Sequence, residues 1–324
     1  MKAIAQDRYG SADVLKFQDI EEPAVGADDV LVRVHAAGCG PDVWHFMAGM
    51  PYMARLSIGL RRPKIRVRGW DVAGTVEAVG ANVTRFSPRD EVMGTAEQGS
   101  FAELASTPAD KLVAKPTSLS FEQAAALPIS GVTALRAVRD EGRVKAGQSV
   151  LVIGASGGVG SLAVQIAKGF GATVTGVCST PKADLVRSLG AVDVIDYTRE
   201  DFADGSRHWD LIVDTAGRRP LSQLRRALTP KGTLVIVGGD GGGRWTGGFF
   251  RGVLRAPIVS LFVGQRLRGL ATKVKNEDLV TLTELVDAGT IAPVIDRTYA
   301  LIESPDAIRY LAEGHAAGKI VITV

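Results

Sequence analysis

Residues 38–45 read "GCGPDVWH", a stretch that places Cys39, Asp42 and His45 within seven positions. Cysteine thiolate and histidine imidazole are ordinary zinc ligands, and a carboxylate can join them. The same kinds of side chain can also carry a proton in general acid–base catalysis. The stretch therefore indicates part of a metal site or part of a metal-free active site, and the rest of the chain has to decide between the two.

The composition limits the class of protein. A chain of 324 residues suits two domains, and its 46% hydrophobic and 23% charged residues are typical of soluble globular proteins. No apolar run reaches 18 residues, and the N-terminus lacks the apolar core of a signal peptide. The only two cysteines, Cys39 and Cys178, argue against a disulfide scaffold and exclude a four-cysteine zinc site. We therefore expect a protein of the reducing cytoplasm.

The charge pattern gives little support to nucleic-acid binding, because the net charge is only +3. Two stretches are nevertheless basic and contain no acid. Residues 55–68, "RLSIGLRRPKIRVR", hold six Lys or Arg, and residues 241–276 hold seven. The plainer interpretation of such stretches is a solvated surface loop. The alternative is that one of them faces an anionic ligand or a membrane surface.

The first 115 residues contain short valine-rich segments separated by Gly, Pro, Asn and Asp, such as "DVLVRVHAAG" and "DVAGTVEAVG". This pattern predicts a compact β-barrel or sandwich. It changes at "SLSFEQAAALPISGVTALRAV", where Ser120 is expected to cap a helix with Gln123 as its capping-box partner. The tail returns to short strands and one helix. We therefore predict a discontinuous first domain of residues 1–120 and 267–324.

The second domain, residues 121–266, alternates apolar runs with helical periods. "SVLVIGA" has the pattern of a buried strand, and "VGSLAVQIAKGFGA" that of a helix with one apolar face. Further strands and helices alternate up to "IVSLFVG", which is predicted to be the last strand. Such alternation predicts an α/β fold with a parallel sheet covered on both faces.

A glycine-rich loop joins that first strand to that first helix, in "LVIGASGGVGSLAVQ". Glycine permits a tight turn and lets a phosphate approach the backbone. The helix N-terminus then offers free N–H groups and the positive end of its dipole to a pyrophosphate. Because the loop lies between a strand and a helix, the pattern predicts dinucleotide binding. The expected contact residues are Gly154, Ser156, Gly157, Gly158 and Val159.

The residues after the second strand indicate which dinucleotide binds. An NAD site places Asp or Glu there to accept from the ribose 2′-hydroxyl. This chain has "VCSTPK", with Ser179, Thr180 and Lys182, and no acid before Asp184. A hydroxyl and an ammonium group can bind a 2′-phosphate that a carboxylate would repel. The sequence therefore favours NADPH, with the alternative that Lys182 is an ordinary lysine at a helix start.

These features together resemble the medium-chain dehydrogenase/reductase superfamily. The motifs "GWDVAGTVEAVG", "ASGGVGSLAVQIAK" and "LGAVDVIDY" are most similar to its zinc-lacking branch of NADPH-dependent quinone oxidoreductases and enoyl or alkenal reductases. The resemblance covers essentially the whole chain. It implies a GroES-like β-barrel catalytic domain and a Rossmann cofactor domain with a doubly wound parallel sheet.

The resemblance also bears on the metal. In zinc-dependent members a Cys-Gly-x-Asp run supplies the first ligand, which "CGPD" at residues 39–42 matches, and a Gly-His-Glu run supplies the second. Here that run reads "GWD", with Trp70 and Asp71, and the region of the third ligand has Ile129 and Ser130. A catalytic zinc requires three protein ligands, so we predict no metal. Without a Lewis acid, hydride transfer to a quinone or an activated C=C bond is easier than alcohol oxidation.

Further cofactor contacts are implied by the resemblance, with the nicotinamide in a cleft between the domains. Tyr197 is expected at the phosphate end and the stretch Gly314–Lys319 near the cofactor. Each has a plainer interpretation, Tyr197 as the end of a strand and Lys319 as a solvated tail residue. The other expected contacts are Thr133, Ala216, Val237, Gly238, Phe262 and Val263.

The catalytic residues are less constrained than the cofactor contacts. Quinone reductases of this branch often place an Asn and a Tyr against the substrate from the segment that matches residues 40–46. This chain has Gly40 and His45 there, which weakens the transfer of quinone specificity. Tyr52, His45 and Asp42 are the candidates for proton donors or orienting groups.

Three functional hypotheses follow. The first is an NADPH-dependent reductase of quinones or α,β-unsaturated carbonyls, and the second is a non-catalytic NADPH-binding redox sensor or scaffold. The third is a reductase at a membrane surface, held by "GGFFRGVLRAPIVSLF", where Pro257 would interrupt a long amphipathic helix. We also predict a homodimer formed by edge-to-edge pairing of the apolar strand of residues 258–264.

Overall fold

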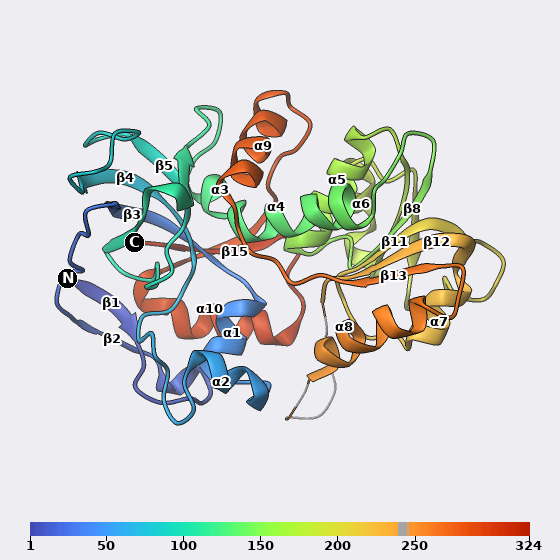
Figure 1. Ribbon diagram of the computed structural model, residues 1–324, viewed down its shortest axis with the longest axis horizontal. Coiled ribbons are helices and arrows are strands. Elements are labelled where there is room, and N and C mark those ends of the chain that lie inside the picture. The colour runs from blue at the N-terminus through green and yellow to red at the C-terminus, as the bar shows by residue number, and fades with distance from the viewer. Residues whose placement is uncertain (239–244, 246) are drawn as a thin grey trace. The chain divides into compact units, whose positions relative to one another are not determined.

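The computed structural model of the protein describes residues 1–238, 245 and 247–324, so part of the basic stretch 241–276 lies outside the described residues. The chain divides into two compact units (Figure 1). The first unit comprises Met1–Val132, Lys273–Gly289 and Pro293–Val324, and the second comprises Thr133–Thr272 and Thr290–Ala292. The main crossings between the units thus fall after residues 132 and 272, where the sequence analysis expected 120 and 266.

A seven-stranded, mainly antiparallel sheet forms the body of the first unit. Its strand order is β14-β15-β3-β4-β5-β7, with β6 also paired to β3, while β1 and β2 form a separate two-stranded sheet. β3 is long enough to pair with β6 through its first half, with β15 through its second half and with β4 along its other edge. The strands are β1 (Lys2–Ala5), β2 (Lys16–Asp19), β3 (Asp29–Cys39), β4 (Asp71–Val79), β5 (Glu91–Thr95), β6 (Leu104–Pro108), β7 (Leu112–Ala114), β14 (Ile295–Ala300) and β15 (Lys319–Thr323).

Local signals set the ends of the helices that follow these strands. α1 (Pro41–Ala48) begins with proline at its first position and ends at Gly49, whose left-handed φ of 61° suits glycine. α3 (Phe121–Ala125) carries the capping box of Ser120 and Gln123, which confirms the prediction. The other helices are α2 (Arg55–Ile58), α4 (Pro128–Leu135), which contains the boundary between the units, α9 (Asn276–Asp287) and α10 (Ser304–Glu313).

The second unit contains the expected doubly wound parallel sheet. Six parallel strands follow the order β10-β9-β8-β11-β12-β13, with α5 and α6 over one face and α7 and α8 over the other (Figure 1). Buried aliphatic side chains from the strands pack against Leu224 of α7 and Ala256 of α8. The elements are β8 (Ser149–Ile153), α5 (Gly158–Gly169), β9 (Thr173–Cys178), α6 (Ala183–Ser188), β10 (Asp193–Asp196), β11 (Trp209–Asp214), α7 (Leu221–Arg226), β12 (Leu228–Ile236), α8 (Gly247–Ser260) and β13 (Arg266–Gly269).

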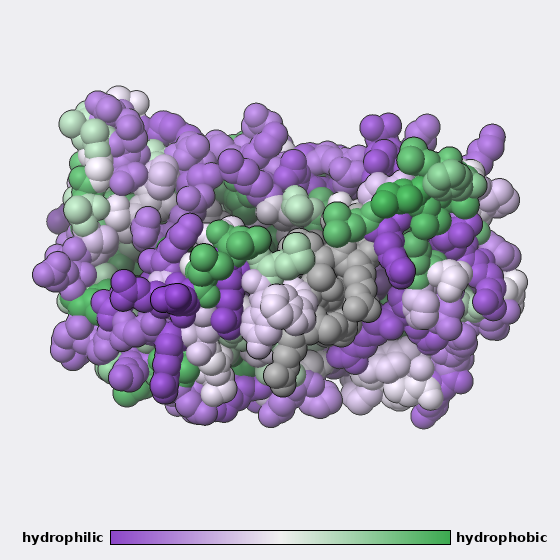
Figure 2. Space-filling view, turned by 60° about the horizontal axis from the view of Figure 1, so that its bottom comes forward, coloured by the Kyte–Doolittle hydropathy of each residue, from purple (hydrophilic) through white to green (hydrophobic). Residues whose placement is uncertain are grey.

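The expected last strand at residues 258–264 is wrong. Ile258 lies in α8, which continues through Pro257, and the edge strand is β13, four residues long and containing Arg266 and Arg268. Apolar side chains of α8 and the turn after it are exposed, and Figure 2 shows hydrophobic residues gathered on the surface of the molecule. A short apolar run fits a buried strand and a helix equally well, which explains the error.

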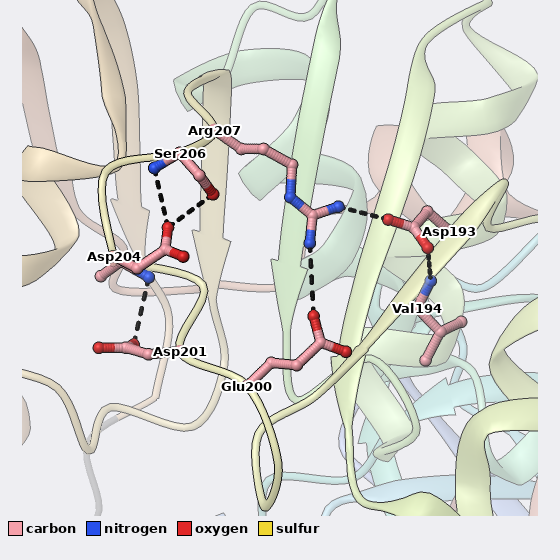
Figure 3. A network of polar contacts seen from close by, with 8 residues as sticks. Asp193, Val194, Glu200, Asp201, Asp204, Ser206 and Arg207 are labelled. Carbon is pink, nitrogen blue, oxygen red and sulfur yellow. Dashed lines mark hydrogen bonds and ion pairs between the residues drawn. The ribbon is translucent and has the colours of Figure 1, made fainter.

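A polar network fixes the connection between β10 and β11 (Figure 3). The guanidinium of Arg207 lies 2.5 Å from a carboxylate oxygen of Asp193 and 3.7 Å from one of Glu200. Asp204 accepts from the backbone N–H and the hydroxyl of Ser206. The loop is thereby tied to β10, the strand at the other edge of the sheet. Among the described residues, none of the helices combines the length and the apolar character needed to cross a bilayer.

Candidate functional site

The glycine-rich loop of the second unit has the space that a dinucleotide requires. Gly154 follows β8 with a φ of 80°, and a Cβ on Gly160 would lie 2.1 Å from the carbonyl oxygen of Gly154. At Gly157, by contrast, a Cβ would have only that same oxygen near it, at 3.5 Å. The loop is therefore closed on the side of the sheet and open at Gly157, where α5 begins. Ser156, Gly158 and Val159 lie in the same loop and the first turn of α5, so these residues fit a pyrophosphate.

Residues that end the neighbouring strands lie beside this loop. The hydroxyl of Thr215 donates to the carbonyl oxygen of Ile153 at 2.8 Å, and a Cβ on Gly238 would lie 2.0 Å from the carbonyl oxygen of Thr215. Because β8, β11 and β12 are parallel, their carboxyl ends share one edge of the sheet. The structure thus places Ala216, Val237 and Gly238 at the carboxyl edge beside the glycine loop, and their contact with the cofactor stays a prediction.

Asp214 is a residue of this edge that the sequence analysis missed. Its buried carboxylate accepts from the backbone N–H groups of Ala216 and Gly217, at 3.1 and 2.9 Å. Burial raises the pKa of Asp214, and these two hydrogen bonds oppose that effect. The carboxylate holds the loop after β11 in place. An aspartate that closes an apolar strand and precedes "TAG" was the available signal.

The end of β9 differs from the expectation in one respect. Ser179, Thr180 and Lys182 follow the strand, but the hydroxyl of Thr180 donates to Asp196, the last residue of β10. Hydrogen bonds from Thr180 and Thr198 lower the pKa of Asp196, so its carboxylate is ionised at neutral pH. The parallel register places Asp196 opposite Cys178. The carboxylate of Asp196 therefore does lie at the end of β9, although it comes from the neighbouring strand. The guanidinium of Arg199 lies 3.6 Å from this carboxylate.

Tyr197 and Thr133 have defined positions in the second unit. Tyr197 follows β10 directly, its side chain is about half exposed, and its N–H donates to the carbonyl oxygen of Cys178. It therefore lies at the carboxyl edge of the sheet beside the end of β9. The hydroxyl of Thr133, in α4, donates to Oγ1 of Thr272 at 3.1 Å.

Phe262 and Val263 do not join the glycine loop. They follow α8 and precede β13, so they lie at the amino edge of the parallel sheet, opposite the carboxyl edge. The side chain of Phe262 is 83% exposed, and Val263 packs at the margin of the apolar core. The error has the same origin as the wrong strand, because these two residues were expected at the end of a strand and lie before one instead.

The stretch 38–45, "GCGPDVWH", lies beside a buried ion pair. Nζ of Lys319, at the start of β15, lies 2.8 Å from Oδ2 of Asp71 at the start of β4 and 3.2 Å from the hydroxyl of Ser130. The other oxygen of Asp71 accepts from the N–H of Ile129 at 2.8 Å. The side chains of Lys319 and Asp71 are only 5% and 1% exposed. Lys319 is thus a buried residue, and its interpretation as a solvated tail residue is wrong.

The two glycines on either side of Cys39 make room for this cluster. A Cβ on Gly38 would lie 2.6 Å from Oδ2 of Asp71, and a Cβ on Gly40 would lie 2.5 Å from Oδ1 of Asp42 and 3.1 Å from Nζ of Lys319. Asp42 and Lys319 therefore both lie against the α-carbon of Gly40. The "GCG" of the sequence is needed for packing, because larger residues would displace the charged groups.

Burial and charge determine the protonation of the cluster. Burial raises the pKa of Asp42 to about 6, against the opposing effect of the Lys319 ammonium. Burial also raises the pKa of the Cys39 thiol to about 12, so Cys39 remains a thiol. For Lys319, burial favours the neutral amine, but Asp71 and Asp42 hold its pKa above the usual value. At neutral pH the cluster thus contains an ammonium group, and Asp42 is the group that titrates nearest to pH 7.

A zinc ion does not fit this donor set. A catalytic zinc needs three protein ligands, whereas the Lys319 ammonium occupies one oxygen of Asp71, whose other oxygen accepts from the N–H of Ile129. Trp70 packs edge-on against Phe46, with ring centres 5.0 Å apart, and offers no ligand atom. Among residues 1–238, 245 and 247–324, no group of three or more His, Cys, Asp or Glu side chains could hold a metal ion.

The other two catalytic candidates have contacts of their own. Nδ1 of His45 lies 3.0 Å from the carbonyl oxygen of Met50 at the end of α1, and the ring packs edge-on against Trp44. The ring of Tyr52 lies under the guanidinium of Arg55, at 4.7 Å from the ring centre. Of the three candidates, Asp42 is the one that the contacts around Gly40 bring beside Lys319.

Two family models of known proteins match parts of this chain. A family model described as "Alcohol dehydrogenase GroES-like domain" matches residues 26–117, and one described as "Zinc-binding dehydrogenase" matches residues 189–322. The crystal structure of a quinone oxidoreductase from Coxiella burnetii has 32% sequence identity and a TM-score of 0.88, covering 100% of this chain and 99% of that one.

Two curated relatives are similar over nearly the whole chain. The mitochondrial NAD(P)H oxidoreductase RTN4IP1 of Mus musculus is 33% identical over 356 residues, which cover 100% of this chain and 89% of the relative. The chloroplastic NADPH-dependent alkenal/one oxidoreductase of Arabidopsis thaliana is 34% identical over 340 residues, which cover 99% of this chain and 79% of the relative.

Proposed function

This chain belongs to the medium-chain dehydrogenase/reductase superfamily and is an oxidoreductase, and we propose that it reduces quinones or α,β-unsaturated carbonyls with NADPH and without zinc. The observation that carries this proposal is the cluster around Gly40. Where a metal-dependent enzyme needs three ligands, this chain has Trp70, an ammonium group paired with Asp71, and the carboxyl group of Asp42, whose pKa is raised to about 6. The names of the relatives support the acceptor class.

NAD(P)H, when bound, supplies the hydride. The open backbone at Gly157 and the N-terminus of α5 would bind the pyrophosphate, and Ala216, Val237 and Gly238 would line the carboxyl edge beside it. We propose a preference for NADPH on the strength of Ser179 and Lys182, which follow β9 where an NAD site has an acid. Asp196 opposes that preference, and Arg199 beside it offsets part of its charge.

Asp42 is the proposed proton donor. Hydride addition to a quinone or an enone leaves negative charge on the acceptor, which needs a hydrogen-bond donor and then a proton. The carboxyl group of Asp42 releases its proton near pH 6, and the Lys319 ammonium stabilises the carboxylate that remains. Lys319 acts as a positioning residue, because it holds Asp71 while lying against the same glycine as Asp42. His45 and Tyr52 remain proposals as orienting groups.

The remaining expectations also stay proposals. The predicted pairing of a strand at residues 258–264 is not available, because residues 258–260 lie in α8, and a homodimer formed through another surface, such as the edge strand β13, stays a proposal. Light scattering at micromolar protein tests this, and a monomeric mass contradicts it. We keep the cytoplasm as the proposed location, while the mouse and Arabidopsis relatives are named as mitochondrial and chloroplastic.

Oxidation of NADPH, followed by its absorbance, tests the proposed reaction. A panel of quinones, enals and enoyl thioesters should contain at least one acceptor that the purified protein reduces, while a simple alcohol with NADP⁺ should give no turnover. NADPH binding without turnover of any acceptor would contradict a reductase and leave the NADPH-binding sensor or scaffold as the function.

A further inference from the structure

A small apolar cavity lies within the first unit, outside the cluster around Gly40. Its volume is about 130 Å³, and its apolar walls come from Tyr9, Phe46, Ile58, Pro63 and Ile65. Phe46 belongs to α1 and Ile58 to α2 (Figure 1), and Tyr9 lies between β1 and β2. Pro63 and Ile65 belong to the segment that joins α2 to β4. α2 and most of this segment form the basic stretch 55–68, whose role the sequence left open.

Arg68 also lines this cavity, and its guanidinium is incompletely paired. The residue is only 3% exposed, and its Nε is a buried atom with no hydrogen-bond partner. One terminal nitrogen donates to the carbonyl oxygen of Ile65. No ion pair joins Arg68 to any carboxylate of the described residues. Burial lowers the pKa of Arg68 to about 10, so the guanidinium is still charged at neutral pH.

A buried cation of this kind is costly without an anion beside it. Taking a charged group out of water costs several kcal/mol, and folded proteins normally offset this with a carboxylate and with hydrogen bonds. Here the nearest polar wall group is not available, because the Tyr9 hydroxyl lies within hydrogen-bond distance of the carbonyl oxygens of Ile58 and Gly59. Lys64, also in the wall, adds a second positive charge. The cavity therefore combines apolar walls with unbalanced positive charge.

We propose that this cavity binds a small apolar monocarboxylate, with its carboxylate accepting from Arg68 and its hydrocarbon part against the apolar walls. The terminal nitrogen of Arg68 that does not donate to Ile65 would donate to the carboxylate in a charge-assisted hydrogen bond. An apolar cavity of about 150 Å³ can hold a benzene-sized group, so the volume suits an aromatic ring or a short aliphatic chain. The site does not depend on the proposed reductase activity.

A chain of neighbouring residues also connects the wall of the cavity with the cluster around Gly40. Phe46 forms one wall, and its ring lies edge-on to Trp70, which directly precedes Asp71. Asp71 in turn is paired with Lys319. A ligand that fixes Phe46 would therefore act on residues that contact the ion pair.

Calorimetry and thermal unfolding of the full chain test the proposal, with benzoate and hexanoate as probes. Each should bind once per chain and raise Tm. Benzyl alcohol, which has the ring without the charge, and inorganic phosphate, which has the charge without the ring, should bind far more weakly. Equal binding of benzoate and benzyl alcohol, or no binding of either carboxylate, would overturn the proposal.

Arg68→Met should weaken benzoate binding about ten- to a hundredfold, because it removes charge-assisted hydrogen bonds while keeping the apolar bulk. The matched control is Arg66→Met, since Arg66 is exposed, lies outside the wall and pairs with Asp7 at 2.8 Å. This variant should bind benzoate like the wild type. Equal losses in both variants, or none in either, would contradict a specific role for Arg68.

The ligand-free proteins give a second readout. Removing a buried and incompletely paired charge should raise the Tm of Arg68→Met above that of the wild type. If that variant does not fold, Ser57→Trp replaces it, because Ser57 is an exposed residue of the wall and a larger side chain there would fill the cavity. Ser57→Trp should lose benzoate binding, and a variant that binds benzoate normally would refute the site.

Discussion

Nζ of Lys319 lies 2.8 Å from Oδ2 of Asp71, and both side chains are almost completely buried. The two residues begin two different strands, β15 and β4, which both pair with β3. Their contact therefore joins distant parts of the first unit at the point where Asp42 lies.

Lys319→Met should destabilise the protein by about 3–5 kcal/mol, because the variant leaves the buried carboxylate of Asp71 without its cation. Urea unfolding at pH 7 measures the change. The control is Lys231→Met, at an exposed lysine of the second unit, which should stay close to the wild type. The double variant Asp71→Asn with Lys319→Met should recover part of the loss, and a double variant as unstable as the sum of the two single variants would argue against the pair.

Asp42→Asn should remove a defined part of the pH dependence of stability. The pKa of Asp42 in the folded protein, about 6, lies above its ordinary value of 3.8, so protonation favours the folded state. This contribution is fully present below about pH 4 and is lost as the pH rises through about 6, which amounts to at most about 3 kcal/mol. The difference in the free energy of unfolding between wild type and variant should therefore change between pH 4 and 6 and be constant above pH 7. A difference independent of pH would mean that the pKa is not raised.

Gly157→Ala and Gly160→Ala should separate nucleotide binding from folding. A Cβ at residue 157 would make only an ordinary contact, 3.5 Å from the carbonyl oxygen of Gly154, so this variant should keep its stability and bind NADPH more weakly. A Cβ at residue 160 would lie 2.1 Å from the carbonyl oxygen of Gly154, so this variant should lose about 1–3 kcal/mol of stability. Thermal unfolding and NADPH fluorescence titration give the two readouts. Unchanged NADPH affinity in Gly157→Ala would place the pyrophosphate elsewhere.

Lys182→Ala and Asp196→Asn should change the cofactor preference in opposite directions. Loss of Lys182 should weaken NADPH binding by about one to two decades and leave NADH binding nearly unchanged. Loss of the Asp196 charge should strengthen NADPH binding, because that carboxylate lies beside Thr180 at the end of β9. Titration of both variants with both cofactors measures this. Equal losses for NADPH and NADH in Lys182→Ala would show that Lys182 does not contact the 2′-phosphate.

The purified protein should contain no stoichiometric zinc and should keep its activity in the presence of a chelator. The physical reason is that Trp70 offers no ligand atom and that the Lys319 ammonium is paired with Asp71, so three protein ligands are not available. Elemental analysis decides the question. About one tightly held zinc per chain, removable only with loss of activity, would contradict the proposed mechanism.

The sequence predicted well those features that depend on residues close together in the chain. Alternating strands and helices, the glycine loop and the capping box of Ser120 depend on residues close together in the chain, and the structure has all three. The run at residues 258–264 failed because apolar character alone does not separate a strand from an exposed helix.

Contacts between distant residues were the ones that the sequence could not supply. Asp196 reaches Thr180 through the register of two parallel strands, and Lys319 reaches Asp71 across most of the chain. Neither spacing has a local pattern. The charge state of Asp42 depends on these same contacts, so its pKa could not be predicted from the motif around Cys39 alone.

The place of β15 in the first sheet has a consequence for folding during synthesis. β15 lies between β14 and β3, so the seven-stranded sheet cannot be completed until β15 has left the ribosome. The second unit lies entirely within the residues made earlier, ending at Ala292. Because domains generally fold as units while the chain emerges, the nucleotide-binding unit should be complete first. Until Lys319 has been made, Asp71 in the nascent first unit lacks its ammonium partner.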